Sequence, residues 1–391
     1  MRADAAAADR ARAVHLAARA WEREGAIDAE TRRAVEARYP DDRQRLGPWF
    51  RLLIFVFSLI AANGFLGVLM LCITSGGETV FGVTMLTVGI GLVVVTEILM
   101  GPLRRADSGM EAASALMALG FLSGGTVLLY SRAASRIEVE VFLITALVVS
   151  ALGALRWGFA FLAAFAAAAG FGLLARLPQG RLMWILAGVA LAVPFLRLSQ
   201  SARLCPSQRR GSAVVLTIAL LALYAGVHIG SCDAGWIEEL SPFGHDVVAP
   251  GGLRAVSILA TAFVPIAILA LGILRRRPLL LNLGILLGVA SLVTLRFYVH
   301  VAPLWVVLTG AGAAALGAAL LLRRFLASGT DRERGGFTAE PLFEDTARRG
   351  VMEVVAALSS LGPAARDLSA SEGGLKTGGG GFGGGGASGE Y

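Results

Sequence analysis

The chain has 391 residues, of which 56% are hydrophobic and only 16% are charged. Soluble domains carry about 25% charged residues, so this composition excludes an ordinary soluble globular protein. The formal net charge of +7 is carried mostly at the ends of apolar blocks, whereas a nucleic-acid-binding protein would gather it on one soluble face.

Residues 1–47 are charged and predict a cytoplasmic helical hairpin. An apolar stripe at spacings of three and four residues runs from Val14 to Trp21, and Gly25 suits a left-handed helix end. Asp28 is placed to cap a second helix, over about residues 29–38. We expect the two helices to touch through Trp21, Ile27, Val35 and Tyr39. The alternative is an Arg-rich helix that lies on the lipid headgroups.

Apolar blocks of about 17–24 residues then fill residues 52–322, and each is long enough to cross a hydrocarbon core of roughly 30 Å as a helix. The blocks lack the polar stripe of a soluble helix. The predicted fold is therefore an all-α, polytopic transmembrane helix bundle of about ten spans. The spans are roughly 52–73, 79–100, 111–130, 139–155, 158–175, 182–198, 213–230, 255–274, 279–298 and 302–322. Within 139–198 the boundaries stay open, because the spans there are short and could tilt, merge or form a hairpin.

Basic residues in short loops predict the orientation of the bundle. The richer set of loops holds Arg43, Arg45, Arg51, Arg104, Arg105, Arg156, Arg203, Arg209, Arg210, Arg275, Arg276, Arg277, Arg323 and Arg324. The opposite set holds Arg132, Arg136, Arg176, Arg181, Arg254 and Arg296. We therefore expect both termini in the cytoplasm. We further expect the protein in the cytoplasmic (inner) membrane of a bacterium, with the first span as its uncleaved signal.

The C-terminal part divides into two predicted segments. Residues 323–364 form a cytoplasmic segment in which Thr338 caps an amphipathic helix that ends at Gly362. Residues 365–391 are polar and then glycine-rich, and they cannot bury enough apolar surface to offset the entropy of ordering. That tail is predicted to be disordered.

Polar groups within the spans are the first candidates for a substrate site, because they are costly to bury in lipid. Glu97 lies one turn from the cytoplasmic end of the second span, where a proton relay, snorkelling or an ion pair near Arg104 and Arg105 would each explain it. Asn63 and Asn282 are mid-span amides, which either bind a ligand or form hydrogen bonds between helices.

A second group of candidates lies near the outer end of the ninth span, where Arg296, Tyr298 and His300 alternate. In an extended stretch before Pro303 they would face one side and could bind an anionic headgroup or a carboxylate. On a helix they would spread over about 200° and serve only as interfacial anchors.

Pro194 and Pro265 interrupt the hydrogen bonding of the sixth and eighth spans. If the ten spans form two halves of five helices, the halves have inverted topology. In transporters of that plan, substrates bind at broken helices. This predicts a site near the two prolines, although the halves show no sequence repeat.

Residues 231–254 form the longest outer loop, which carries the acidic residues Glu238, Glu239 and Asp246 beside His245. These groups could supply a general base or bind a metal, but no nucleophile motif accompanies them. No cysteine and histidine spacing of a zinc site occurs, so we expect no metal and no cofactor. We name no catalytic residue. His15, in the N-terminal hairpin, is expected to be a solvated side chain.

The stretch from Trp21 to Thr31, WEREGAIDAET, followed by Tyr39 and many spans, resembles an uncharacterised bacterial family of polytopic membrane proteins. The resemblance implies a cytoplasmic N-terminal helical hairpin before the bundle, and no catalytic residues. The glycine-rich stretch from Gly378 to Tyr391 is similar to the tails of some membrane-anchored proteins of the TPM-domain type, although the TPM domain itself is absent.

Three functions remain, in order of preference. The first is a non-enzymatic scaffold or accessory protein of the lipid bilayer, with a protein partner at residues 1–47 or 325–391 and no nucleic acid. The second is a secondary transporter of a small solute. The third is a membrane enzyme with a site in the loop of residues 231–254, so whether the protein is an enzyme stays open.

Overall fold

Helices make up almost all of the chain that is described by the structure, a computed structural model. The described residues are 3–40, 43, 46–72, 77–103, 108–130, 138–177, 179–232, 251–275, 277–299, 303–328, 333–334 and 337–338. The chain divides into two units, Met1–Val307 and Leu308–Tyr391, and each is described by itself.

The first unit begins with the predicted helical hairpin, made of α1 (Ala3–Arg23) and α2 (Ala29–Arg38). Gly25 ends α1 with a φ of +74°, and the Ala26 amide donates to Trp21 O at 2.8 Å, which is a Schellman motif. Asp28 caps α2, because its Oδ1 accepts from the Thr31 amide at 2.8 Å. Both predicted helix ends are confirmed.

The contact between α1 and α2 is polar, so the predicted apolar contact is wrong. Trp21 is 49% exposed and Tyr39 is 48% exposed. The helices are joined by ion pairs from Arg32 to Glu22 at 2.9 Å and from Arg19 to Glu36 at 3.0 Å. A ten-residue helix with no buried residue has too little apolar surface to form a core with α1, so its charges make the contact.

His15 takes part in the same contact. Its Nε2 lies 2.7 Å from Tyr39 O, a hydrogen bond between α1 and the end of α2. The side chain is not buried, in keeping with the expectation of a solvated residue, and it also makes this contact between the helices. The partner lies 24 residues away in the sequence, so local sequence does not reveal it.

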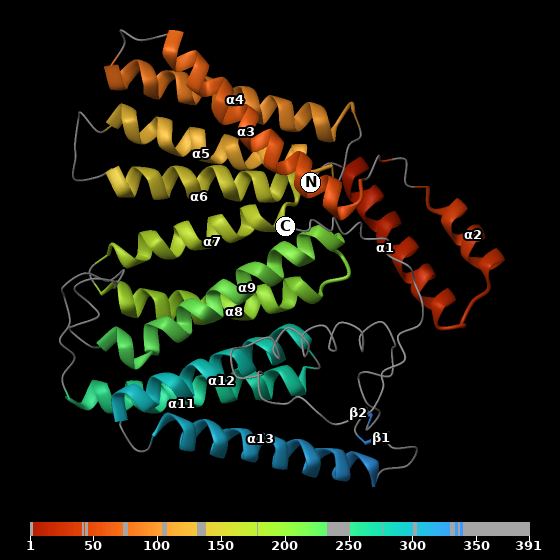
Figure 1. Ribbon diagram of the computed structural model, residues 1–391, viewed down its shortest axis with the longest axis vertical. Coiled ribbons are helices and arrows are strands. Elements are labelled where there is room, and N and C mark those ends of the chain that lie inside the picture. Colours follow the sequence, from red (N-terminus) through yellow and green to blue (C-terminus); the bar gives the residue numbers. More distant parts are fainter. Residues whose placement is uncertain are drawn as a thin grey trace, which may run out of the picture. The chain divides into compact units, whose positions relative to one another are not determined.

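Ten apolar helices follow among the described residues, and each one overlaps a predicted span (Figure 1). Eight of them are long and apolar enough to cross a membrane, and α7 is a shorter apolar helix. The chain is therefore a multi-pass membrane protein. The helices are α3 (Pro48–Cys72), α4 (Gly77–Met100), α5 (Met110–Tyr130), α6 (Glu138–Trp157), α7 (Ala160–Ala175), α8 (Gly180–Gln200), α9 (Pro206–Val227), α11 (Gly251–Leu274), α12 (Pro278–Val299) and α13 (Leu304–Ala327).

The helix boundaries that the sequence left open are decided by local backbone chemistry. Gly158, with a φ of +79°, separates α6 from α7, so these spans do not merge. α9 begins at Pro206, well before the predicted residue 213, because proline fits the first turn of a helix. A short 3₁₀ helix, η1 (Ile229–Cys232), follows α9.

Neighbouring helices of the first unit pack in sequence order and approach closely at glycines. Close pairs are α4 with α5, α6 with α7, α8 with α9, and α11 with α12, while α7 also packs on α9. A methyl group placed on Gly82 of α4 would lie 3.1 Å from Gly125 O of α5. One on Gly284 of α12 would lie 2.7 Å from Leu269 N of α11. Small residues at such crossings let helix backbones meet, as is typical of membrane bundles.

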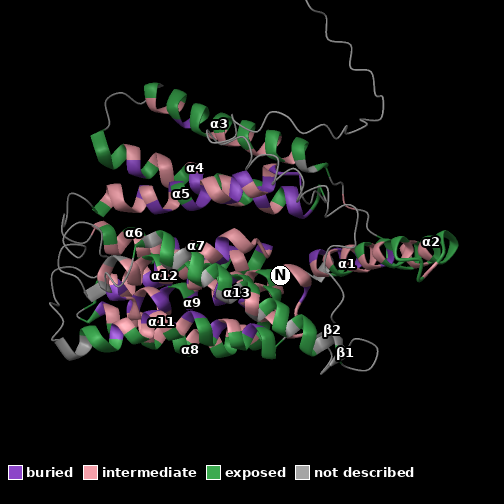
Figure 2. Cartoon of the chain, turned by 60° about the horizontal axis from the view of Figure 1, so that its bottom comes forward, coloured by how far each residue is buried: buried purple, intermediate pink, exposed green. Residues whose placement is uncertain are grey.

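The interior between these helices is mostly apolar, although it also holds buried serine and threonine residues and the buried Glu111. One cluster of buried residues includes Leu119 of α5, Trp157 of α6 and Leu162 of α7. Another joins Leu220 of α9 to Ile268 of α11 and the side chains of α12 around them. By contrast, α3 is mostly exposed along its length (Figure 2), which suits a helix that faces lipid.

The second unit contains most of α13 and a short antiparallel strand pair, β1 (Glu333–Arg334) and β2 (Phe337–Thr338). Glu333 pairs with Thr338, and Arg334 pairs with Phe337. Thr338 therefore ends a strand at the position predicted to cap a helix. The predicted amphipathic helix beyond Thr338 and the tail of residues 365–391 lie outside the described residues.

Candidate functional site

Glu97 of α4 is held in an ion pair. Its carboxylate accepts from Arg156 Nε at 2.8 Å, from a terminal Arg156 nitrogen at 3.0 Å, and from Trp157 Nε1 at 2.9 Å. Arg156 and Trp157 end α6, 59 and 60 residues away. A bidentate pair with a further donor favours the predicted ion-pair explanation over a proton relay. Arg104 and Arg105 lie outside the described residues.

The two mid-span amides do not meet at a common site. Asn63 is exposed on α3, where its Nδ2 donates to Leu59 O at 2.9 Å and lies 3.6 Å from Met117 Sδ of α5. Asn282 is exposed on α12. The helices that carry the two prolines are continuous, with Pro194 exposed inside α8 and Pro265 fully buried inside α11. No helix is therefore broken at either proline.

Arg296 and Tyr298 lie on the last turns of α12, which remains helical to Val299. Residues two apart on a helix point about 200° from each other, so Arg296 and Tyr298 do not face one side. Of the two alternatives from the sequence, this arrangement fits interfacial anchors and not a shared binding site. Arg296 Nε is buried and has no hydrogen-bond partner among the described residues. Tyr298 lies beside η1, because a methyl group placed on Gly230 would be 3.5 Å from the tyrosine oxygen. His300 lies outside the described residues.

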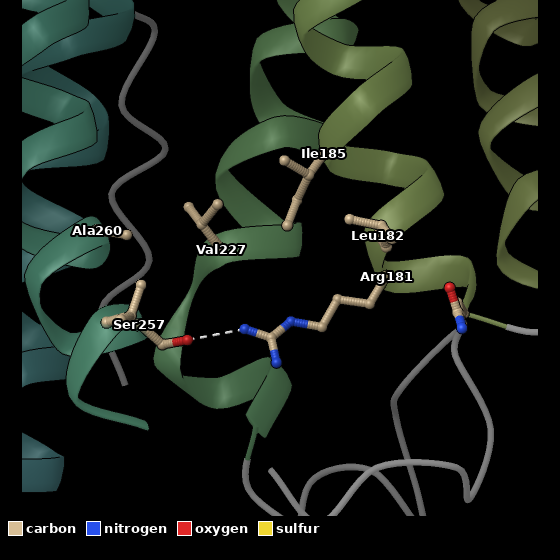
Figure 3. Close-up of a pocket in the computed structure, with 8 residues that line it drawn as sticks. Arg181, Leu182, Ile185, Val227, Ser257 and Ala260 are labelled. Carbon is tan, nitrogen blue, oxygen red and sulfur yellow. Dashed lines mark hydrogen bonds between the residues drawn. The ribbon is translucent and has the colours of Figure 1, made fainter. Parts of the chain in front are cut away.

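A polar cluster that the sequence analysis missed lies where α8 begins, α9 ends and α11 begins. We call it the Arg181 cluster; it consists of Arg181, His228, Ser257, Thr261, Ser291 and Thr294. Arg181 Nε donates to Gly226 O at 2.7 Å. A terminal nitrogen of Arg181 donates to Ser257 Oγ at 2.8 Å (Figure 3). One guanidinium thus joins three helices.

Thr261 is the buried centre of this cluster. Its Oγ1 accepts from the Ile229 amide of η1 at 2.9 Å and donates to Ser257 O at 2.7 Å. Ser291 Oγ of α12 donates to Thr261 O at 2.7 Å. All four residues are buried, so these bonds satisfy polar groups that would otherwise be costly.

His228 is fixed in one tautomer by its neighbours. The Gly230 amide donates to Nδ1 at 3.0 Å, so that nitrogen carries a lone pair. The neutral ring therefore bears its proton on Nε2, which lies 3.2 Å from Thr294 Oγ1. Thr294 in turn donates to Ala290 O at 2.9 Å. These bonds order the end of α9 against α12.

Beside the Arg181 cluster lies a cavity of about 390 Å³. Arg181 is its one charged side chain from the described residues, and most of the other side chains that line it are aliphatic. Among the described residues no group of histidine, cysteine and carboxylate side chains is placed to bind a metal ion. The lining residues, several of which Figure 3 labels, are Gln179, Arg181, Leu182, Ile185, Val227, Val256, Ser257 and Ala260.

The hairpin is attached to the bundle by a helix cap that comes from another helix. Asp9 Oδ2 of α1 accepts from the Ser207 amide in the first turn of α9 at 2.7 Å. Cys205, at the N-cap position of α9, makes no capping bond, so the carboxylate replaces the missing cap and faces the positive end of the helix. Buried alanines line α1 near this contact: Ala5, Ala8 and Ala11.

Sequence reasoning missed both contacts because each joins distant segments. Asp9 and Ser207 are 198 residues apart, and Arg181 and Ser257 are 76 apart. One signal was available for the first: α9 begins with Cys205-Pro206 and has no Ser, Thr, Asp or Asn at its N-cap. In comparisons with known proteins, no family model, curated protein or solved structure matches the chain.

Proposed function

We propose that this chain is a non-enzymatic scaffold or accessory protein of the bacterial cytoplasmic membrane, which presents its N-terminal hairpin to a protein partner in the cytoplasm. The observation that carries the proposal is the capping contact between Asp9 and Ser207, which fixes α1 at the start of α9. A hairpin attached in this way is a rigid platform and not a loose tail.

The exposed surface of the hairpin supports a protein partner. Leu16 is 50% exposed, and Trp21 and Tyr39 are nearly as exposed, although all three lie in a segment bound by ion pairs. Exposed aromatic residues beside charged groups are typical of the contacts that dominate protein interfaces.

The proposed orientation follows from where the hairpin attaches. The start of α9 has Arg203, Arg209 and Arg210 close in sequence, and these belong to the basic set of loops. By the positive-inside rule this end of α9 faces the cytoplasm, so the hairpin lies there too.

The mostly apolar interior favours a scaffold over a transporter, and the hydroxyls of Thr96, Ser150 and Thr261 within it are bonded to backbone carbonyls of their own helices. The three buried clusters consist of hydrophobic residues, and the carboxylate of Glu97 is occupied by Arg156 and Trp157. A transport path would need polar groups facing a common space at mid-membrane.

The second candidate, a secondary transporter, is favoured by the cavity beside Arg181. The residues predicted for a transport site, Asn63, Glu97, Pro194, Pro265 and Asn282, are not among those that line it. The third candidate, a membrane enzyme, depends on Glu238, Glu239, His245 and Asp246, which lie outside the described residues.

The test is site-specific photo-crosslinking in intact cells with the full chain. A photoreactive residue at position 16 of α1 should give an adduct with one discrete protein. The same residue at position 57 of α3, which is more exposed but lies on a helix that faces lipid, is the matched control and should give no such adduct. The additional change Trp21→Glu should remove the adduct at position 16.

Absence of a protein adduct at position 16, together with solute uptake by reconstituted vesicles, would favour the transporter instead. We also propose that the chain is related to the bacterial family that residues 21–39 resemble. A second contact with a protein partner is proposed at residues 325–391.

A further inference from the structure

The guanidinium of Arg181 is only partly satisfied. Nε and one terminal nitrogen are bonded to Gly226 O and Ser257 Oγ, whereas the other terminal nitrogen is buried with no hydrogen-bond partner among the described residues. Burying a charged donor without an acceptor costs free energy, so a ligand that supplies an acceptor for the guanidinium would gain binding free energy.

Arg181 also lines a cavity whose composition suits an amphiphile. Apart from Gln179, Arg181 and Ser257, its lining is aliphatic: Leu182, Ile185, Val227, Val256 and Ala260. Val256 is 64% exposed and Leu182 is exposed as well, so the aliphatic wall continues onto the outer surface of the helices. Figure 3 shows Arg181 extending across the cavity from α8 to Ser257 of α11.

The start of α8 adds to the attraction for an anion. Gln179 precedes the helix in the left-handed conformation and makes no side-chain capping bond, so the first amides of α8 keep their donors. These donors and the positive end of the helix dipole favour a negative group on the same side as Arg181.

The depth of Arg181 matches a lipid headgroup. It is the second residue of α8, a span of 21 residues, and so lies near one end of the hydrocarbon crossing. Phospholipid headgroups occupy this level in either leaflet, and their acyl chains extend from it along the helices.

We propose that the cavity between α8, α9 and α11 binds an anionic phospholipid, with its phosphate at the Arg181 guanidinium and one acyl chain along the aliphatic wall. This site is independent of the scaffold function. The lipid adds to the hydrogen bonds by which Arg181 joins α8 to Gly226 of α9 and Ser257 of α11. The packing of these three helices would then depend on membrane composition.

The experiment is native mass spectrometry of the full-length protein, released from detergent with phosphatidylglycerol and phosphatidylcholine in competition. The wild-type chain should retain phosphatidylglycerol preferentially, and Arg181→Gln should reduce that preference about tenfold, as expected for the loss of a charge-assisted contact. Arg254→Gln is the matched control, because Arg254 is an exposed cation at the same end of α11, and it should leave the preference unchanged.

A second variant retains the hydrogen bonds of Arg181 to Gly226 and Ser257. Ala260→Phe fills the aliphatic part of the cavity and leaves both Arg181 and Ser257 unchanged, so it should also lower retention of phosphatidylglycerol. Equal retention of the two lipids, or an unchanged preference in both Arg181→Gln and Ala260→Phe, would overturn the proposal. So would full competition by inorganic phosphate, because the site would then hold a free anion.

Discussion

At the scale of single residues, polar groups in this bundle serve to join helices. The sequence was sufficient to mark Glu97, because an acid in an apolar block stands out. The sequence was not sufficient to identify Arg156 and Trp157 as the partners of Glu97. They lie 59 and 60 residues away in the chain and come close to it only because α4 and α6 are both part of the folded bundle. Arg181 was counted only as an outer-loop charge for the same reason.

Trp157 offers the cleanest test of the Glu97 contact. Trp157→Phe removes the Nε1 donor to Glu97 from a buried side chain and should lower the free energy of unfolding by about 1–3 kcal/mol. Thermal unfolding in detergent, followed by circular dichroism, measures the change. Trp49→Phe is the control, because Trp49 is 80% exposed on α3, and it should be nearly neutral. Equal effects of the two changes would argue against the contact.

The hairpin should be sensitive to acid through Glu36. Its pKa is held below the usual value of 4.5, chiefly by the hydrogen bond from Arg19, with smaller contributions from the charges of Arg32 and Arg19. A lowered carboxyl pKa stabilises the hairpin above pH 4.5, and this contribution is lost as the pH falls through the pKa of the folded state.

Spin labels at residues 16 and 37 of the full-length protein measure this effect as the distance between α1 and α2. The distance distribution should be narrow at pH 7 and should broaden well below pH 4.5. Glu36→Gln should be broad already at pH 7. A distribution that stays narrow under all these conditions contradicts a hairpin held by ion pairs.

At the scale of elements, hydropathy was enough to place each span because the blocks are long and nearly uncharged. Helix starts were less predictable, as α9 shows, since its polar first turn continues the helix beyond the apolar block. Contacts between helices were not predictable, because a helix that is apolar all round does not reveal which face meets a neighbour.

Substituting two glycines of α12 distinguishes the effect of close helix packing from that of helix propensity. A methyl group on Gly284 would lie within 2.9 Å of three atoms of Leu269, two of them backbone, whereas one on Gly288 would meet nothing within 4 Å. Gly284→Ala should therefore lower stability by about 1–3 kcal/mol through overpacking. Gly288→Ala should be neutral or slightly stabilising. Thermal unfolding of both variants decides, and a tolerated Gly284→Ala would show that α11 and α12 are not in close contact.

At the scale of the whole molecule, composition and the series of apolar blocks were enough to predict a multi-pass membrane protein. The attachment of the hairpin was not predictable, because Asp9 resembles any other surface acid in a charged helix. Its significance depends on a start of α9 that lacks its own cap. The scaffold proposal depends on this contact and on the side of the membrane where it lies.

Cysteine labelling in membrane vesicles tests both points at once, in a chain without its native cysteines. Leu16→Cys is exposed on α1, and Ala8→Cys is buried near the contact with α9. We expect a membrane-impermeant maleimide to label Leu16→Cys in inside-out vesicles only, and to label Ala8→Cys only when Asp9→Ala is also present. Labelling of Leu16→Cys from the outside, or labelling of Ala8→Cys with Asp9 intact, would contradict a hairpin attached to the cytoplasmic end of the bundle.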